Sequence, residues 1–168
     1  MMDYSMIGKI QKAKEYAEDP SRVTFNSFTL EFDGSNDSYI ATLGADGWHC
    51  TCPGFQMYAI CPHIMSMERR FGPMLKRQPL PYAAGQNLVS DVDKAKHYAD
   101  DLETRVRFIA FNAQFRGGHN AYTINYDNGV WECDNPYFIS RGICSNTMAM
   151  ERILKGMVRP LELSVPVD

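Results

Sequence analysis

The chain has 168 residues, of which 45% are hydrophobic and 22% are charged. This balance excludes a disordered, highly charged chain and allows one ordinary domain or two small ones. The formal net charge of −3 excludes a general electrostatic attraction to nucleic acid or to an anionic membrane, so any contact with a polyanion must be local.

The start of the chain lacks the long apolar run of a secretory signal, and no stretch has the apolar length needed to cross a bilayer. We therefore expect a soluble, cytoplasmic protein. The five cysteines are an odd number, which in a reducing compartment favours metal binding over a disulfide framework.

Sliding the chain against itself so that Trp48 falls on Trp131 aligns its two halves. Other residues that then coincide are Cys50 and Cys133, Pro53 and Pro136, Phe55 and Phe138, Ile60 and Ile143, and Cys61 and Cys144. Two unrelated segments would share hydrophobicity, but they would not share tryptophan, proline and cysteine positions. We therefore predict two tandem repeats, over residues 1–85 and 86–168.

A short amphipathic helix is predicted to open each repeat, over residues 6–17 and 93–101, because apolar residues recur there at helical spacing. A strand follows, since the apolar period changes to two from Val23 and from Val106. In both strands the alternation slips once, at matching places, which predicts a β-bulge in each. The slips fall between Phe25 and Phe28 and between Phe108 and Phe111.

Two further strands and a helix complete each repeat. The alternation resumes at Tyr39 and Tyr122 and runs into turns rich in Gly, Asp and Asn, which predicts a hairpin whose last strand begins at the matched tryptophan. Helical spacing returns over Pro62–Phe71 and Ser145–Leu154. The sequence therefore predicts an α+β fold with antiparallel sheets, in which each repeat has a helix, three short strands and a second helix.

The first repeat contains Cys50-x-Cys52 and Cys61-x-His63, separated by residues 53–60. Three thiolates and one imidazole are a full tetrahedral ligand set for zinc. The first pair ends a strand, and the second lies where a helix begins, whose free N–H groups favour thiolates. We predict one structural zinc ion that clamps the hairpin to the helix. Buried core thiols beside an ordinary histidine are the alternative.

This pattern, C-x-C-x(n)-C-x-H after an aromatic strand and before a helix, resembles the SWIM-type zinc finger family from Trp48 to about Phe71. The resemblance implies a zinc-binding ββα module that contacts DNA or protein. It also implies that the three cysteines and the histidine of the pattern take the family's ligand roles.

The second repeat keeps the first and third cysteines of the pattern, as Cys133 and Cys144, but has Asn135 and Asn146 in the other two places. Two thiolates and two amides are a poor zinc site, so we predict one zinc ion per chain. We expect the two cysteines to lie close together and the asparagines to form local hydrogen bonds, with Asn146 suited to cap the helix. A disulfide between the cysteines is conceivable but disfavoured in a reducing compartment.

Basic residues follow the closing helix of both repeats. They are Arg69, Arg70, Lys76, Arg77, Arg152, Lys155 and Arg159. They form either a surface that contacts phosphates or a solvated surface that complements the helix dipole. Tyr58, Tyr82 and Tyr137 are loop aromatics that could anchor a protein or stack on bases.

An enzyme needs an open metal position, or a nucleophile beside a base, and the sequence offers neither. We therefore predict a non-enzymatic zinc-binding module that mediates macromolecular interaction, without a membrane or a small-molecule substrate. The family resemblance favours DNA as the partner, and the acidic balance favours a protein. The alternative is a structural or adapter subunit of a larger complex that makes no contact with nucleic acid.

Overall fold

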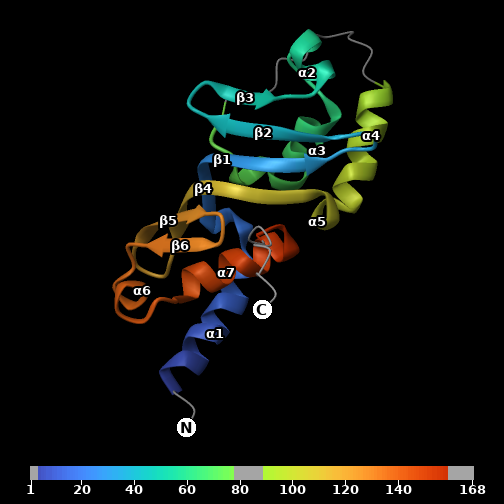
Figure 1. Ribbon diagram of the computed structural model, residues 1–168. Coiled ribbons are helices and arrows are strands. Elements are labelled where there is room, and N and C mark those ends of the chain that lie inside the picture. The colour runs from blue at the N-terminus through green and yellow to red at the C-terminus, as the bar shows by residue number, and fades with distance from the viewer. Residues whose placement is uncertain (1–3, 78–88, 159–168) are drawn as a thin grey trace, which may run out of the picture.

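The computed structural model describes residues 4–77 and 89–158 (Figure 1). The first half contributes α1 (Tyr4–Ala17), β1 (Val23–Asp33), β2 (Ser38–Gly44), β3 (Gly47–Cys50), α2 (Pro53–Tyr58) and α3 (Pro62–Phe71). The second half contributes α4 (Val89–Asp100), α5 (Leu102–Arg105), β4 (Val106–Arg116), β5 (Ala121–Asp127), β6 (Val130–Cys133), α6 (Pro136–Arg141) and α7 (Ser145–Leu154). Short 3₁₀ turns lie at Pro20–Arg22, Gly72–Met74 and Lys155–Met157. The predicted α+β class is confirmed.

The six strands of the described chain form one antiparallel sheet in the order β3-β2-β1-β4-β5-β6 (Figure 1). The two long strands, β1 and β4, pair with each other at its centre, so each half contributes three neighbouring strands. Both halves also bury their apolar side chains in one hydrophobic core. The boundary predicted at residue 85 lies outside the described residues, and the duplication stays a prediction.

The predicted β-bulges are present where β1 pairs with β4. One register shift skips Asn26 of β1, and the other skips Ile109 of β4. Because side chains alternate along a strand, each skipped residue returns the next apolar side chain to the covered face of the sheet. The aromatic side chains on either side of the two bulges are consequently buried: Phe25, Phe28, Phe108 and Phe111.

The helix that opens each half packs on the other half. Helix α1 lies along α7, and α4 lies along α3, at opposite ends of the molecule (Figure 1). The first half is therefore covered by a helix that follows it in the chain. Within residues 4–77 and 89–158, no helix has the length and apolar character needed to span a membrane.

An ion pair joins α3 to α5 and so ties the two halves together. Arg70 Nη1 lies 2.6 Å from Glu103 Oε1, and Arg70 Nη2 also donates to the Ala99 carbonyl oxygen at 3.0 Å. Both charged side chains are about three-quarters buried. The hydrogen bond from Arg70 holds the pKa of Glu103 at about 2, below its ordinary value of 4.5.

Replacing Glu103 with glutamine is expected to lower the free energy of unfolding at pH 7 by about 1 kcal/mol. Because the folded-state pKa of Glu103 is depressed, the ion pair stabilises the fold fully above about pH 4.5 and is lost as the pH falls toward 2. Denaturant titrations of both proteins should therefore converge as the pH is lowered. Glu15→Gln, at an exposed position of α1, serves as the control. A difference between the wild type and Glu103→Gln that stays constant with pH would contradict the assignment.

Candidate metal centre

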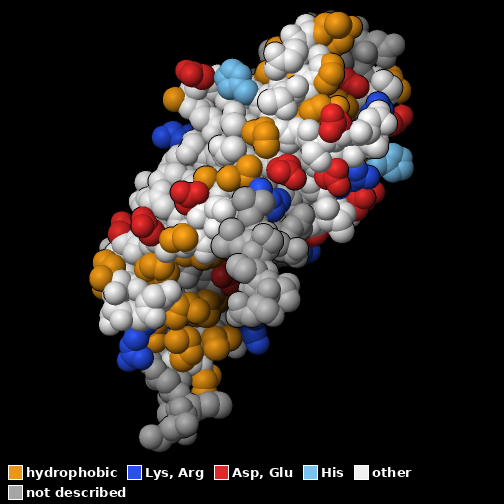
Figure 2. Space-filling model, in the orientation of Figure 1, with side chains coloured by type: hydrophobic (Ala, Val, Ile, Leu, Met, Phe, Trp, Pro, Cys, Tyr) orange, Lys and Arg blue, Asp and Glu red, His pale blue; other side chains and the backbone are white. Residues whose placement is uncertain are grey.

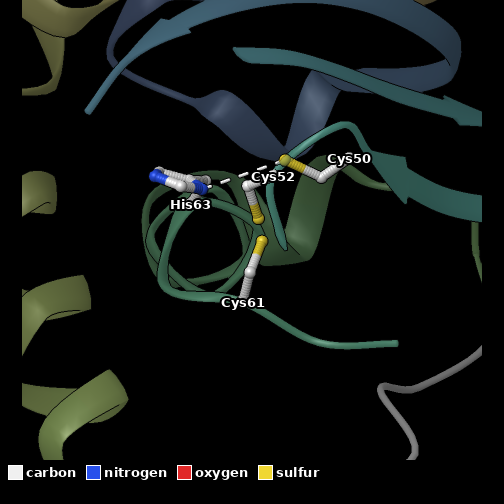
Figure 3. A group of neighbouring side chains, drawn as sticks. All are labelled: Cys50, Cys52, Cys61 and His63. Carbon is white, nitrogen blue, oxygen red and sulfur yellow. Dashed lines mark hydrogen bonds between the residues drawn. The ribbon is translucent and has the colours of Figure 1, made fainter. Parts of the chain in front are cut away.

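The structure brings the four predicted ligands together. Cys50 ends β3, Cys52 and Cys61 directly precede α2 and α3, and His63 lies in the first turn of α3. Their three Sγ atoms and one ring nitrogen all lie within 4.8 Å of one another, and all four residues are buried. The side chains point toward a common centre (Figure 3). This compact group can hold one metal ion.

Helix α2 folds the loop that separates the two pairs of ligands. Cys52 caps this helix, since its Sγ accepts a hydrogen bond from the Phe55 N–H at 3.4 Å, and Pro53 occupies the first helical position. The helix ends at Ala59, whose φ of 58° is left-handed and turns the chain back. Cys61 thereby returns to the side of Cys52. Helical spacing did not predict α2. The signal present in the sequence was Pro53 directly after Cys52, because proline is favoured at the first position of a helix.

Hydrogen bonds among the ligands determine where the protons reside. The Cys61 thiol, and then the His63 ring at 3.8 Å, stabilise the Cys50 thiolate and lower its pKa to about 4, against the opposing effect of burial. The pKa of Cys61 is raised because its proton is held by Cys50, and burial raises the pKa of Cys52. A cation therefore meets one thiolate already formed, and it must displace the remaining thiol protons to complete its shell.

Three aromatic rings surround the His63 imidazole. The ring centroids of Phe32, Tyr39 and Tyr98 lie 4.8, 5.0 and 5.5 Å from it, and Tyr98 is stacked at 12°. These contacts fix the ring with Nδ1 toward Cys50, as outer-shell residues of metal sites do. Tyr98 belongs to α4, so a residue of the second half completes the site. The strand alternation indicated Phe32 and Tyr39 only as core residues, and no sequence signal placed Tyr98 here.

Gly34 lies directly behind the imidazole. A Cβ atom on Gly34 would come within 3.0 Å of His63 Nε2 and 3.1 Å of the Asp37 carbonyl oxygen. Because the aromatic rings leave the imidazole little room to move, Gly34→Ala is expected to displace it and to weaken metal binding by about tenfold or more. Competition with a chromophoric chelator measures the change in affinity.

Gly117 offers a matched control for this prediction. It occupies the corresponding position of the second half, where a Cβ atom would meet the Asn120 carbonyl oxygen at 3.2 Å. Gly117→Ala carries a similar steric cost but lies far along the chain from the ligands, so the metal affinity should stay unchanged. An equal loss of affinity in both variants would show that Gly34 acts only through general stability.

The corresponding positions of the second half form a different cluster. Cys133 and Cys144 are buried and share a hydrogen bond, which lowers the pKa of Cys144 to about 6 and raises that of Cys133. Asn135 Nδ2 donates to Asn146 Oδ1 at 2.8 Å. The expected closeness of the cysteines and the local asparagine bonds are confirmed. The expected cap is wrong, because Cys144 caps α7 by accepting from the Thr147 N–H at 3.5 Å, while Asn146 faces Asn135.

Half of the described basic residues proposed as partner contacts are ion-paired within the chain. Arg77 donates to Glu68 through Nε at 2.8 Å, and Arg70 and Lys155 both contact Glu103, Lys155 at 3.6 Å. Arg69, Lys76 and Arg152 are exposed, and so is Lys155, whose side chain is 63% exposed despite its ion pair. Arg159 lies outside the described residues. Three of the six described cations are thus engaged with carboxylates.

The loop aromatics differ in their exposure. Tyr58, at the end of α2, is 64% exposed. Tyr137 is only partly exposed, and the cations of Lys9 and Arg141 lie 4.8 and 5.8 Å from its ring centroid. Tyr82 lies outside the described residues. Of the two described tyrosines, Tyr58 is therefore the one free to meet a partner.

Comparisons with protein-family models, with curated proteins and with solved structures found no match for this chain. The resemblance to SWIM-type zinc fingers therefore rests on the spacing of the four ligands in the sequence. The metal centre itself rests on the geometry of those ligands in the fold.

Proposed function

We propose that this chain is a non-enzymatic, zinc-stabilised module of SWIM type that recognises another macromolecule, and that this partner is a protein. The observation that carries the proposal is the buried group of three cysteines and one histidine, with all ligand atoms within 4.8 Å of one another. This donor set is typical of structural zinc. Four protein ligands leave no metal position for a substrate or a catalytic water, which supports a structural role for the ion.

A tandem duplication is part of the proposal, with a metal-bearing first copy and a second copy that binds no zinc. Several paired features support it. The two bulges fall at Asn26 and Ile109, and a ligand position caps each short helix, Cys52 in α2 and Asn135 in α6. We also propose a cytoplasmic location, where reducing conditions keep the five buried thiols free.

The distribution of charge favours a protein over DNA. On the face shown in Figure 2, Lys and Arg side chains are scattered singly among Asp and Glu. A groove of about 780 Å³ on the uncovered face of the sheet is lined by three carboxylates, those of Asp46, Asp127 and Glu132. A phosphate backbone would be repelled from this groove, because nucleic-acid binding needs a continuous basic surface.

Helix α2 presents the surface best suited to a protein. Met57 and Tyr58 are 73% and 64% exposed at its end, next to the loop that the ligands close. Methionine and tyrosine are enriched in protein interfaces, and tyrosine is also enriched among the residues that contribute most binding energy. The metal would therefore hold in place the loop that carries these two contacts.

Co-purification of the zinc-loaded chain tests this proposal. One stoichiometric protein should accompany the wild type, and Met57→Ser/Tyr58→Ser should lose it without a change in metal content or melting temperature. The matched control is Ile139→Ser on α6, which removes an equally exposed apolar side chain, 73% exposed, from the other half. Retention of the partner by the double variant would rule out the α2 surface.

DNA binding is the second candidate, because the family resemblance implies it and because Arg69, Lys76 and Arg152 remain exposed. A DNA binder that uses these side chains should lose affinity steeply as the salt concentration rises. Reversing all three charges to glutamate should then abolish binding and leave the fold intact. Failure of the wild type to bind duplex or single-stranded DNA at low salt would eliminate this candidate and leave the adapter role.

A further inference from the structure

We propose that Cys133 and Cys144 form a second metal site, one that takes a single soft monovalent cation, Cu⁺, between two thiolates. This site is independent of the zinc site and of the proposed partner. It lies where the first half has a complete set of four ligands, but its donor chemistry is different.

The donors present select the class of cation. Both thiols are buried and flank the same pair of asparagines. The Asn135 N–H donates to Cys133 Sγ at 3.5 Å, and Asn146 Oδ1, which accepts from Asn135 Nδ2 at 2.8 Å, lies 3.8 Å from Cys144 Sγ. The two amides are already occupied, since Asn135 caps α6 and donates to Asn146. Two sulfur donors cannot complete the four-ligand shell of zinc, whereas thiolates are the ligands that select Cu⁺.

The surroundings of the two sulfur atoms suit a buried anion. Two thiolates around one monovalent cation carry a net negative charge, which needs hydrogen-bond donors when it is buried. The Asn135 N–H donates to Cys133 Sγ at 3.5 Å, and the Thr147 N–H donates to Cys144 Sγ at 3.5 Å. Cys144 also caps the N-terminus of α7, a ten-residue helix whose dipole favours negative charge there.

An entry route reaches Cys133 from the surface. Cys133 lines a groove of about 550 Å³ on the second half, together with Glu132, Asp134, Phe138 and Ile139. Glu132 and Asp134 are exposed carboxylates that attract a cation to the groove. At neutral pH binding releases the remaining thiol proton, that of Cys133, to solvent, forms two Cu–S bonds and transfers no electron.

The test uses the full, reduced, zinc-loaded chain, titrated anaerobically with Cu⁺ in competition with a chromophoric Cu⁺ chelator. We expect one equivalent of Cu⁺ to be retained while the zinc content stays constant. X-ray absorption at the copper edge should show two sulfur neighbours. Cys133→Ser should weaken Cu⁺ binding at least a hundredfold, and its zinc content and melting temperature establish that it folds.

Three results would overturn the proposal. One is equal retention of Cu⁺ by the wild type and by Cys133→Ser. Another is release of zinc in proportion to the copper taken up, which would place Cu⁺ on the first-half ligands. The third is a bond between Cys133 and Cys144 that survives reduced glutathione, which alkylation under native conditions and mass spectrometry would detect, because the pair would then be a structural disulfide.

Discussion

Replacing Cys61 with serine is expected to abolish stoichiometric metal binding and to lower the melting temperature by about 10 °C. Serine cannot supply the soft anionic donor that the site requires, and the three remaining ligands bind zinc weakly. An ion present at about a thousand times its dissociation constant stabilises the folded state by about 4 kcal/mol. For a chain of this size, each kcal/mol corresponds to about 2–4 °C. Elemental analysis and thermal unfolding measure the two effects.

Cys144→Ser is the matched control for Cys61→Ser. Both cysteines are fully buried, and each occupies the N-cap of a ten-residue helix. Any loss of stability caused by replacing a buried thiol at a helix start should therefore appear in both variants. Only Cys61→Ser should lose zinc. Unchanged zinc content and unchanged melting in Cys61→Ser would refute the metal centre.

The local elements were predictable because their signals are local. The closing helices run over Pro62–Phe71 and Ser145–Leu154, as the helical spacing predicted. The bulges at Asn26 and Ile109 were predictable from the slip in the apolar alternation of each strand. A strand with such a slip keeps its aromatic side chains on one face only if it bulges there. The ligands were predictable because cysteine and histidine at that spacing have few other uses.

The features that the sequence did not reveal depend on packing between distant segments. Periodicity shows that α4 has an apolar face, but not that Tyr98 from this face stacks on His63. The pairing of Arg70 with Glu103 likewise depends on how the halves meet, so Arg70 looked available to a partner when the sequence alone was considered. Helix α2 has only six residues, too few for a helical period to be recognised.

A second zinc site is expected when Asn135→Cys and Asn146→His are introduced together. These changes restore the first-half ligand pattern beside Cys133 and Cys144. The asparagines already contact each other, with Asn135 Nδ2 and Asn146 Oδ1 2.8 Å apart. The cysteine and histidine that replace them would therefore place their metal-binding atoms close together. The double variant should therefore bind about two zinc ions per chain, and it should melt above the wild type when zinc is in excess.

The structure around Asn146 also suits a histidine. Tyr16 of α1 lies 5.7 Å from Phe115 between ring centroids, much as Tyr98 lies 5.4 Å from Phe32 beside His63. The Cβ position of Gly117 is 3.8 Å from the Asn146 amide nitrogen, whereas that of Gly34 is 3.0 Å from the His63 ring. A glycine thus lies beside Asn146, and the ring of Tyr122 lies 3.6 Å from the Cβ position of that glycine.

The single variants show whether the four donors act as one set. Asn135→Cys alone adds a third thiolate without the imidazole, and Asn146→His alone adds the imidazole without the third thiolate, so each should bind its second zinc ion much more weakly than the double variant. The wild-type chain, titrated in parallel, should bind one zinc ion. A double variant that folds and still binds a single zinc ion would show that the two halves differ in backbone geometry and not only in their ligands. Two bound ions would show that two side chains account for the absence of zinc from the second half, because its backbone already holds the ligand positions in place.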